Sequence, residues 1–447
     1  MDYGIFKAYD IRGVYPSEID ERTVYAIAQA YAKYFSPKKV VLGRDVRLSG
    51  QFLWQAAVNG FIDHGVDVLD IGIITTDMLY FAAAACDVDG GLSITASHNP
   101  RDYNGIKMVL RGAVAISSDS GLREIKNLVE QNYKYQSRQP GRVTQKEIMG
   151  DYLTKCLEFV DLSELKRLKV VLNGMNGPVL RNLRAANLPI EIIPLNEEMD
   201  GSFPKGQPDP LQEKNRLETA EAIIREKPDF GVAWDADADR FFLFDENGRY
   251  IPGYYITAFL GEYFSAKNPG AKVINDIRLT WAVRDRVSTA GGIALENKAG
   301  HTFIKERMRK EGAVFGGEMS GHYYFRDYFY ADNGLIPFLL MLEIVSVSGK
   351  KVSELFEPFF QKYFISGEIN TALSDFEKAK GTILKIESLY PDTKKEHIDG
   401  LSLEEEDWRA NIRPSNTEPL LRLNVEAKSA ELMKQKTDEL LGVIRAD

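Results

Sequence analysis

The segment "KKVVLGRD" at residues 38–45 places a lysine before a short apolar, partly β-branched run that ends in a polar loop. Two later segments repeat this order, "LKVVLNGMNG" at 168–177 and "AKVINDIR" at 271–278. Such runs are typical of buried parallel strands when helices alternate with them, and a helical pattern follows the first run at 50–65. The repetition predicts three related α/β units.

A second pattern follows each of these segments, at a distance of roughly half a domain. The segments "GLSITASHNP" (91–100), "GVAWDADADR" (231–240) and "AVFGGEMSGH" (313–322) each begin with small and apolar residues and then break into a polar loop. The paired order strengthens the repeat. We therefore expect each unit to contribute one polar loop.

The last part of the chain has a different pattern. Residues 394–413 predict a hairpin, and a loop, an alternating strand and an amphipathic C-terminal helix follow up to residue 447. Turn-rich or charged stretches place domain boundaries near 145, 248 and 365. The predicted fold class is three related mixed α/β domains, at 1–145, 146–248 and 249–365, plus a C-terminal α+β domain at 366–447.

Composition limits the function classes. The chain has 447 residues, enough for about three or four domains. It carries 65 acidic and 56 basic side chains, a formal net charge of −9. This balance argues against general nucleic-acid binding, but a local cluster of arginine and lysine is enough to bind a small anionic substrate.

The cysteines and the apolar segments bear on the compartment. Cys86 and Cys156 are the only cysteines, and their wide separation argues against a disulfide framework and favours a reducing compartment. The N-terminus lacks the apolar core of a signal peptide. The apolar run at 335–347 contains Pro337 and Glu343 and is too short to span a bilayer, so it predicts a buried helix. We expect a cytoplasmic protein that does not enter the membrane.

The loop "DADADR" places Asp235, Asp237 and Asp239 at alternating positions between two apolar strands. Three carboxylates this close repel one another unless a cation lies among them, and carboxylate oxygens suit a hard cation such as Mg²⁺. The alternative is a solvated acidic turn. An EF-hand is a poor fit, because Arg240 stands where its sharp turn needs glycine and because strands flank the loop. The spacing favours a divalent-metal site, with Arg240 facing an anion beside it.

The loop "GGEMSGH" presents Glu318, Ser320 and His322 between glycines. A carboxylate, a hydroxyl and an imidazole can all form hydrogen bonds with sugar hydroxyls, and the glycines let the backbone come close. The alternative is a flexible loop with unrelated polar residues.

The loop "RPSNTEP" gathers Arg413, Ser415, Asn416 and Thr417. A guanidinium fork with several hydroxyl and amide donors suits a phosphate group, although such a string is more often an ordinary turn. A P-loop motif is absent from the sequence, which argues against a P-loop nucleotide enzyme.

Ser97 lies at the end of an apolar run, in "ITASHNPRDYNG". A hydroxyl is a weak nucleophile until a base or a metal activates it. The sequence around Ser97 is not a G-x-S-x-G elbow. His98 is the next residue, but adjacency in sequence does not position it as the base of a catalytic triad, so a hydrolase triad is a poor fit. A serine beside a divalent metal and phosphate-binding arginines instead fits phosphoryl transfer.

These four loops occur in the order "TASHNP", "DADADR", "GEMSGH" and "RPSNTEP", and together they closely resemble the α-D-phosphohexomutase family, above all its phosphomannomutase/phosphoglucomutase members. The resemblance extends over the full length, from "KAYDIRG" at 7–13 to the last domain. It implies four domains around a central cleft and a Mg²⁺-dependent enzyme that interconverts hexose 1- and 6-phosphates of mannose or glucose. A phosphoserine and a hexose 1,6-bisphosphate intermediate or activator are part of that implication.

The resemblance also implies roles for single residues. Ser97 resembles the serine that carries the transferable phosphate and contributes an oxygen to the metal, and the three aspartates resemble the Mg²⁺ ligands. The residues that resemble those around the reacting phosphate are Arg12, His98, Lys107 and Arg240, and His301 resembles a histidine that assists proton transfer. Those that resemble substrate-binding residues are Tyr9, Arg278, Glu318, Ser320, His322, Arg413, Ser415, Asn416 and Thr417.

Two departures from the family pattern matter. Ala236 and Ala238 replace the glycines that usually separate the metal aspartates, and a positive φ is costly for alanine, so a slightly different loop shape is expected. Arg278 stands where close relatives often have lysine, and arginine stays protonated, which argues against a proton-transfer role. Lys107 as a solvated lysine and His301 as a structural histidine remain the alternatives at those positions.

Several questions stay open at the level of sequence. Phosphoglucosamine mutases are a rival within the family, although they tend to carry GEQSGH and RPSGTEP. A metal-dependent sugar-phosphate phosphatase and a binding protein are the rivals outside it. The preference between mannose and glucose is undecided, and the expected partners are sugar phosphates, with the chain as a monomer or a weak homodimer.

Overall fold

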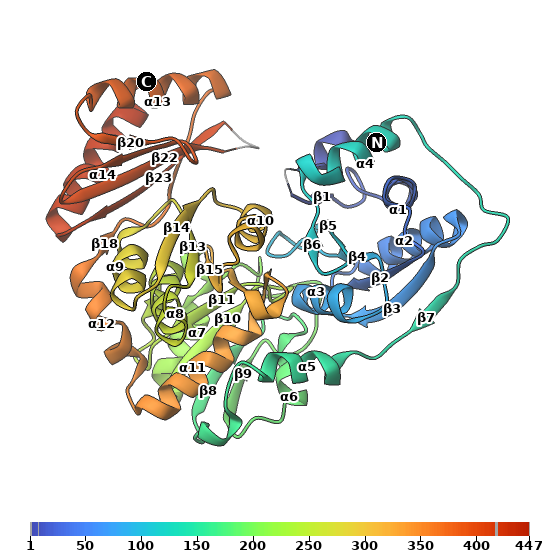
Figure 1. Ribbon diagram of the computed structural model, residues 1–447, viewed down its shortest axis with the longest axis horizontal. Coiled ribbons are helices and arrows are strands. Elements are labelled where there is room, and N and C mark those ends of the chain that lie inside the picture. The colour runs from blue at the N-terminus through green and yellow to red at the C-terminus, as the bar shows by residue number, and fades with distance from the viewer. Residues whose placement is uncertain (1, 8, 416–418, 447) are drawn as a thin grey trace. The chain divides into compact units, whose positions relative to one another are not determined.

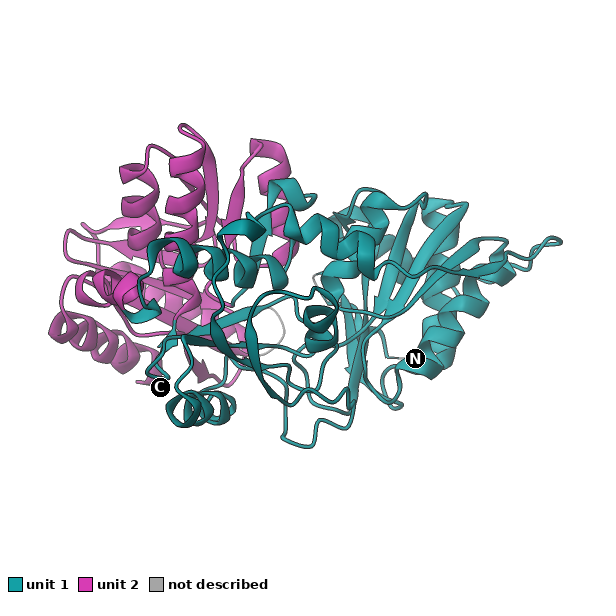
Figure 2. Ribbon diagram, turned by 90° about the horizontal axis from the view of Figure 1, so that it is seen from below, with its two compact units in different colours: residues 1–251, 321–353 teal, residues 252–320, 354–447 magenta. Residues whose placement is uncertain are grey.

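The computed structural model describes residues 2–7, 9–415 and 419–446 (Figure 1). The chain divides into two compact units, and each unit combines two stretches of sequence (Figure 2). The first unit comprises 1–251 and 321–353, and the second comprises 252–320 and 354–447.

The first sheet has the order β1-β5-β4-β2-β3-β7, and β6 pairs with β5. Its strands are β1 (Ile11–Val14), β2 (Lys39–Arg44), β3 (Asp67–Ile73), β4 (Gly90–Ile94), β5 (Tyr103–Leu110), β6 (Val114–Ala115) and β7 (Val143–Gln145). Strand β2 runs parallel to β3 and β4, whereas β5 is antiparallel to β4 and to β1. The sheet is therefore mixed, as predicted.

Helices cover this sheet. They are α1 (Glu21–Phe35), α2 (Gly50–His64), α3 (Thr76–Ala85) and α4 (Arg123–Glu130). Helix α1 begins after Asp20, whose carboxylate accepts a hydrogen bond from the backbone N–H of Thr23, as an N-cap residue should. Val40 and Leu42 of β2 lie in one core with residues of α1, α2 and α4. Because side chains alternate along a strand, Val41 faces the opposite side.

The second sheet has the order β12-β11-β10-β8-β9. Its strands are β8 (Lys169–Asn173), β9 (Glu191–Leu195), β10 (Phe230–Trp234), β11 (Phe241–Phe244) and β12 (Tyr250–Ile251). Parallel pairing joins β8 to β9 and β10, and β10 and β11 form an antiparallel pair. The helices of this region are α5 (Met149–Leu157), α6 (Val179–Ala185) and α7 (Leu217–Glu226).

Residues 321–353 complete the first unit. Strands β16 (Tyr323–Phe325) and β17 (Ala331–Asp332) pair antiparallel, and α11 (Leu335–Ser348) follows. Ten residues of α11 are buried, so the apolar run forms the predicted buried helix. Pro337 is tolerated because it lies in the first turn, where the backbone N–H groups have no intrahelical partner.

The second unit begins with a parallel arrangement. Strand β13 (Lys272–Asp276) pairs with β14 (Ile293–Asn297) and with β15 (Phe315–Gly317). The helices here are α8 (Gly253–Lys267), α9 (Trp281–Thr289), α10 (His301–Glu311) and α12 (Val352–Lys362), the last of which begins in the first unit.

The C-terminal part is an antiparallel sheet with two helices. The sheet has the order β18-β23-β22-β21-β20, and β19 pairs with β23. Its strands are β18 (Phe364–Ile365), β19 (Ile369–Ala372), β20 (Lys394–Glu396), β21 (Leu401–Glu404), β22 (Trp408–Pro414) and β23 (Leu420–Ala427). With α13 (Phe376–Leu389) and α14 (Ala430–Arg445), it has the predicted α+β character.

The remaining short helical turns are a π-helix at Ser118–Leu122 and 3₁₀ turns at Tyr3–Ile5, Leu162–Glu164, Glu213–Asn215 and Arg326–Tyr328. Within the described ranges, no helix is both long and apolar enough to cross a membrane. The domain boundaries at 145, 248 and 365 stay predictions. Residues 321–353, which the sequence assigned to the third domain, fall in the first compact unit.

Candidate active site

Ser97 follows β4 and has a left-handed backbone, with φ of +49°. Its hydroxyl donates a hydrogen bond of 2.7 Å to Oδ2 of Asp235 and lies 3.1 Å from Nδ1 of His98. Its backbone N–H donates to Oγ1 of Thr95 at 3.0 Å. The residue is only 1% exposed. The hydroxyl of Ser97 is therefore buried and directed at the acidic loop.

The acidic loop joins β10 to β11. The antiparallel register pairs Trp234 with Phe241, so residues 235–240 form a loop between two fully buried strands. Asp235, Asp237 and Asp239 are all buried, and one oxygen from each lies within 4.8 Å of the others. The alternative of a solvated acidic turn is therefore wrong.

Lys107 of β5 supplies positive charge to this loop. Its ammonium nitrogen lies 2.8 Å from Oδ2 of Asp237 and also forms an ion pair with Asp239. Burial alone would lower the pKa of Lys107, but these two carboxylates outweigh it and raise the pKa above its ordinary value. Lys107 is 5% exposed, so the alternative of a solvated lysine is wrong.

The three carboxylates differ in their electrostatic environment. Burial, reinforced by Asp239 and Asp237, raises the pKa of Asp235 well above its ordinary value. Burial would do the same to Asp239, but Lys107 and His322 hold the pKa of that carboxyl well below its usual range. Oδ1 of Asp237 is buried and accepts no hydrogen bond from any residue that the structure describes. A buried carboxylate oxygen without a partner is costly, and a divalent cation would satisfy it.

Helix α3 also contacts the acidic loop. At its first residue, Thr76, the backbone N–H donates to the carbonyl of Asp237 at 2.8 Å, and the hydroxyl donates to Oδ2 of the same residue at 2.6 Å. The hydroxyl of Thr95 lies 3.2 Å from that oxygen. The positive end of the helix dipole thus faces Asp237.

Cationic and imidazole groups lie around Ser97. Arg12 donates to Oδ1 of Asn99 at 2.6 Å, and its Nη2 lies 2.8 Å from Asp10. The backbone N–H of Arg240 donates to Asp235 at 3.3 Å, and its Nε lies 3.7 Å from that carboxylate. Burial, together with Arg240 and Arg12, lowers the pKa of His98 well below its ordinary value, so the imidazole is neutral near pH 7.

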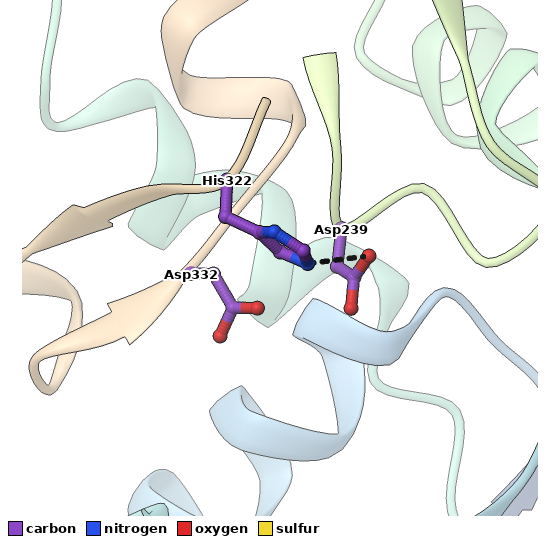
Figure 3. Close-up of side chains that lie close together, drawn as sticks. All are labelled: Asp239, His322 and Asp332. Atoms are coloured by element: carbon purple, nitrogen blue, oxygen red, sulfur yellow. Dashed lines mark ion pairs between the residues drawn. The ribbon is translucent and has the colours of Figure 1, made fainter. Parts of the chain in front are cut away.

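His322 faces the acidic loop as well. Its Nε2 lies 3.5 Å from Oδ1 of Asp239. Asp332 of β17 lies beside these two residues, and one potential ligand atom from each of the three lies within 4.8 Å of the others (Figure 3). Residues 240 and 322 also form an isolated backbone bridge. The sequence predicted a sugar-binding role for His322, and the structure adds a contact with the acidic loop.

A second set of predicted residues lies in the second unit, around Glu368. This carboxylate lies 3.0 Å from Arg413, 3.4 Å from Arg278 and 3.4 Å from Arg422. Burial would raise the pKa of Glu368, but the three arginines lower it to about 2. Arg278 also forms ion pairs with Asp276 at 2.8 Å and with Glu318 at 3.7 Å. Arg278, Glu318 and Arg413 therefore belong to one network of ion pairs.

The remaining predicted residues are placed as follows. Tyr9 lies in the bend before β1 and His301 begins α10, both partly buried. Ser320 follows β15 in a turn. Ser415 is buried, and its backbone N–H donates to the carbonyl of Leu420 at 2.9 Å. Asn416 and Thr417 lie outside the described residues.

Several residues of these networks escaped the sequence reasoning. They are Asp10, Thr76, Thr95, Asn99, Asp276, Asp332, Glu368 and Arg422. Thr76 carried a usable signal, because paired threonines before an apolar run are typical of a helix start. Glu368 carried none, since it lies 45 residues from Arg413 along the chain.

At the acidic loop, Ala238 takes the left-handed conformation, with φ of +54°, whereas the backbone of Ala236 is not left-handed. The cost expected of alanine in place of glycine therefore falls on Ala238 alone. The loop keeps this turn despite that cost.

Four sequence models match consecutive parts of the chain. They are described as phosphoglucomutase/phosphomannomutase alpha/beta/alpha domain I (residues 4–136), domain II (150–248), domain III (252–363) and the C-terminal domain (368–443). The chain belongs to the phosphoglucomutase/phosphomannomutase family. The predictions of the family and of the fold class are confirmed.

Curated relatives and solved structures of this family match over the full length. A phosphomannomutase of Salmonella montevideo is 44% identical, and the match covers 99% of both chains. A protein of Xanthomonas campestris (strain B100) named phosphohexose mutases is also 44% identical and covers 100% of both chains. The crystal structure of a phosphoglucomutase/phosphomannomutase family protein from Burkholderia thailandensis has a TM-score of 0.89 at 31% identity, covering 100% of this chain and 98% of that one. The prediction of a phosphohexomutase enzyme is confirmed.

Proposed function

We propose that this phosphohexomutase interconverts hexose 1-phosphate and hexose 6-phosphate, of mannose or glucose, through phospho-Ser97. The observation that carries the proposal is the hydrogen bond of 2.7 Å from the Ser97 hydroxyl to Asp235, inside a buried group of three carboxylates. A serine beside such a group fits phosphoryl transfer, where catalysis consists mainly of positioning and charge neutralisation.

Asp235, Asp237 and Asp239 would hold one Mg²⁺, with an oxygen of Ser97 as a further ligand. Their donor set is all oxygen, which suits Mg²⁺, and the buried Oδ1 of Asp237 offers a ligand atom without a hydrogen-bond partner among the described residues. When bound, the ion would neutralise charge on the transferring phosphoryl group.

Ser97 would give its phosphoryl group to the free hydroxyl of the sugar phosphate. The P–O bond to Ser97 would break as a P–O bond to the sugar oxygen forms, and the proton of the sugar hydroxyl would end on the freed Ser97 oxygen, which gives a hexose 1,6-bisphosphate. In the second step the other phosphate returns to Ser97 by the reverse exchange. Arg12, Lys107 and Arg240 supply positive charge in the same unit, and Nδ1 of His98 lies 3.1 Å from the Ser97 hydroxyl.

We also propose substrate-binding roles for residues of the second unit. We assign phosphate binding to Arg278, Arg413 and Ser415, and the same role stays predicted for Asn416 and Thr417. Glu318 and Ser320 would bind sugar hydroxyls, and His301 would assist proton transfer. His322 and Tyr9, which belong to the first unit, are proposed as further substrate-binding residues. The network of Arg278, Glu318 and Arg413 supports this assignment.

The test is a coupled assay with mannose 1-phosphate, glucose 1-phosphate and glucosamine 1-phosphate side by side. Turnover of the first two to their 6-phosphates supports the proposal. Turnover of the third alone would make the chain a phosphoglucosamine mutase, release of inorganic phosphate would make it a phosphatase, and binding without turnover would make it a binding protein. A cytoplasmic monomer or weak homodimer that binds neither nucleic acid nor membrane is the expected setting.

A further inference from the structure

Arg47 is an almost fully buried arginine that follows β2, and it is 1% exposed. Its Nη1 donates to the carbonyls of Pro100 at 2.6 Å and Tyr103 at 2.9 Å. Its Nη2 donates to the carbonyls of Ser97 and Asn99, both at 2.7 Å. One guanidinium therefore binds three backbone carbonyls of the loop that carries Ser97 and the carbonyl of Tyr103, the first residue of β5.

The position of this guanidinium is fixed from its other sides. Nε lies 3.2 Å from Oδ2 of Asp45, and the guanidinium carbon lies over the Phe203 ring, 5.1 Å from the ring centroid. Asp45 in turn accepts the backbone N–H of Arg47 at 2.9 Å and the hydroxyl of Thr95 at 2.7 Å. Thr95 is the residue that accepts the backbone N–H of Ser97. Arg47 thus binds the carbonyl of Ser97 directly, and Asp45 supports the N–H of Ser97 through the Thr95 hydroxyl.

The loop needs such support. Ser97 has φ of +49°, a conformation that costs a non-glycine residue about 1–2 kcal/mol and that persists only where the surroundings enforce it. The carbonyl bond to Arg47 and the N–H bond to Thr95 enforce it here. With the backbone so fixed, the hydroxyl points at Asp235.

We propose that Arg47 is a positioning residue for phosphoryl transfer, holding the Ser97 loop so that its oxygen stays aligned beside the acidic loop. This role rests on the proposed function of Ser97. Arg47 acts through the backbone and touches no reacting atom. Lysine cannot replace it, because an ammonium group lacks the planar fork that reaches four carbonyls at once.

The test compares Arg47→Lys with Arg181→Lys. Arg181 is a partly buried arginine of the same unit that donates to the carbonyl of Ile73 at 2.8 Å and does not contact the Ser97 loop. Steady-state kinetics with glucose 1-phosphate, thermal unfolding, and hydrogen exchange of the peptide spanning 97–103 are measured for both. We expect Arg47→Lys to lower kcat about 100-fold, the scale for small misplacement of a reacting group, with KM changed less than about 3-fold. Hydrogen exchange of the 97–103 peptide should rise in Arg47→Lys. Arg181→Lys should leave kcat and this exchange unchanged.

A fall in kcat at nearly constant KM, measured in a folded variant, distinguishes a positioning role from a general loss of stability. A folded Arg47→Lys variant with unchanged kcat well below its unfolding temperature would overturn the role, and so would a rise in KM at constant kcat. If Arg47→Lys does not fold, the Asp45→Asn/Arg47→Gln double variant takes its place, because it removes both buried charges together. Its kcat, KM and exchange of the 97–103 peptide are then judged by the same criteria. A wild-type chain without mutase turnover overturns the proposed function itself, and the role of Arg47 with it.

Discussion

The ammonium nitrogen of Lys107 lies 2.8 Å from Oδ2 of Asp237. The register of the first sheet explains this contact, because Lys107 of β5 is paired with Ser93 of β4 and so shares a sheet face with Ser93 and Thr95. That face is the one that meets Asp237, since Thr95 contacts the same carboxylate oxygen. Lys107 is thus a built-in counter-ion of the acidic loop.

Replacing Lys107 should make stability depend more strongly on a divalent ion. Lys107→Met leaves buried carboxylates without their counter-ion, which typically costs about 3–5 kcal/mol. Mg²⁺ should restore part of this loss by binding the folded state. Thermal unfolding in EDTA and in MgCl₂ checks this: the rise in Tm on adding MgCl₂ should be larger for the variant than for wild type. Lys126→Met, at a solvent-exposed pair with Glu130, is the control. Equal rises in all three proteins would contradict the prediction.

Asp237→Asn should lower kcat about 100- to 1000-fold, the range seen when one electrostatic contact to a transition state is lost. The substitution removes a carboxylate that contacts Lys107, Thr76 and Thr95 and that we assign to the metal. EDTA should abolish wild-type turnover, and added Mg²⁺ should restore it. Asp161→Asn, at an exposed 3₁₀ turn, is the matched control. Full wild-type activity in excess EDTA would refute the assignment of the metal.

The two alanines of the acidic loop provide a matched pair. Ala238 has φ of +54° and Ala236 has no positive φ, although both are buried. Each change to glycine removes a buried methyl group and raises the conformational entropy of the unfolded chain, and both effects destabilise the fold. Only Ala238→Gly also removes the energetic cost that a left-handed backbone has for a residue with a Cβ atom. Urea unfolding should therefore show Ala236→Gly to be more destabilising than Ala238→Gly by about 1 kcal/mol. The reverse order would show that the backbone conformation is not what limits this loop.

Glu368 predicts a specific pH dependence of stability. Its folded pKa is about 2, below the ordinary value of 4.5, because three arginines outweigh burial. A lowered carboxyl pKa stabilises the folded state above the ordinary pKa, and this stabilisation is lost as the pH falls from 4.5 toward 2. The full contribution is about 3 kcal/mol.

The Glu368→Gln variant should lack this dependence. The difference in unfolding free energy between wild type and the variant should be constant above about pH 5.5 and shrink by about 1 kcal/mol on going to pH 3.5. Glu377→Gln, at an exposed position of α13, is the control for a surface glutamate. A difference that stays constant from pH 6 to pH 3.5 would show that the arginines do not hold Glu368 ionised.

Local patterns were enough to predict much of this molecule. The lysine-led strands and the polar loops after them predicted the α/β repeats, and three alternating aspartates between apolar strands favoured a divalent-metal site, which stays a prediction. For Ser97, the missing G-x-S-x-G elbow argued against a hydrolase triad, and its role as the phosphate carrier followed from the family resemblance and stays a prediction. These inferences work because strand periodicity and carboxylate repulsion depend on residues close in sequence.

The partners that come from far along the chain could not be predicted. The pairing of Lys107 with Asp237 depends on the register of β5 and on how the first two sheets pack, which no local pattern encodes. Arg47 lies 50 residues from Ser97, and its preceding segment looks like an ordinary polar loop. Glu368 joins three arginines that are separate in sequence. Their roles depend on tertiary contacts alone.

The central claim is that Ser97 carries the transferable phosphate, and peptide mapping by mass spectrometry tests it most directly. The protein is incubated with glucose 1,6-bisphosphate and digested, before and after a chase with excess glucose 6-phosphate. We expect phosphate on the peptide that contains Ser97, its transfer to the sugar during the chase, and neither phosphate nor turnover in Ser97→Ala. Phosphate confined to another residue, or a Ser97→Ala variant that retains mutase activity, would contradict the account.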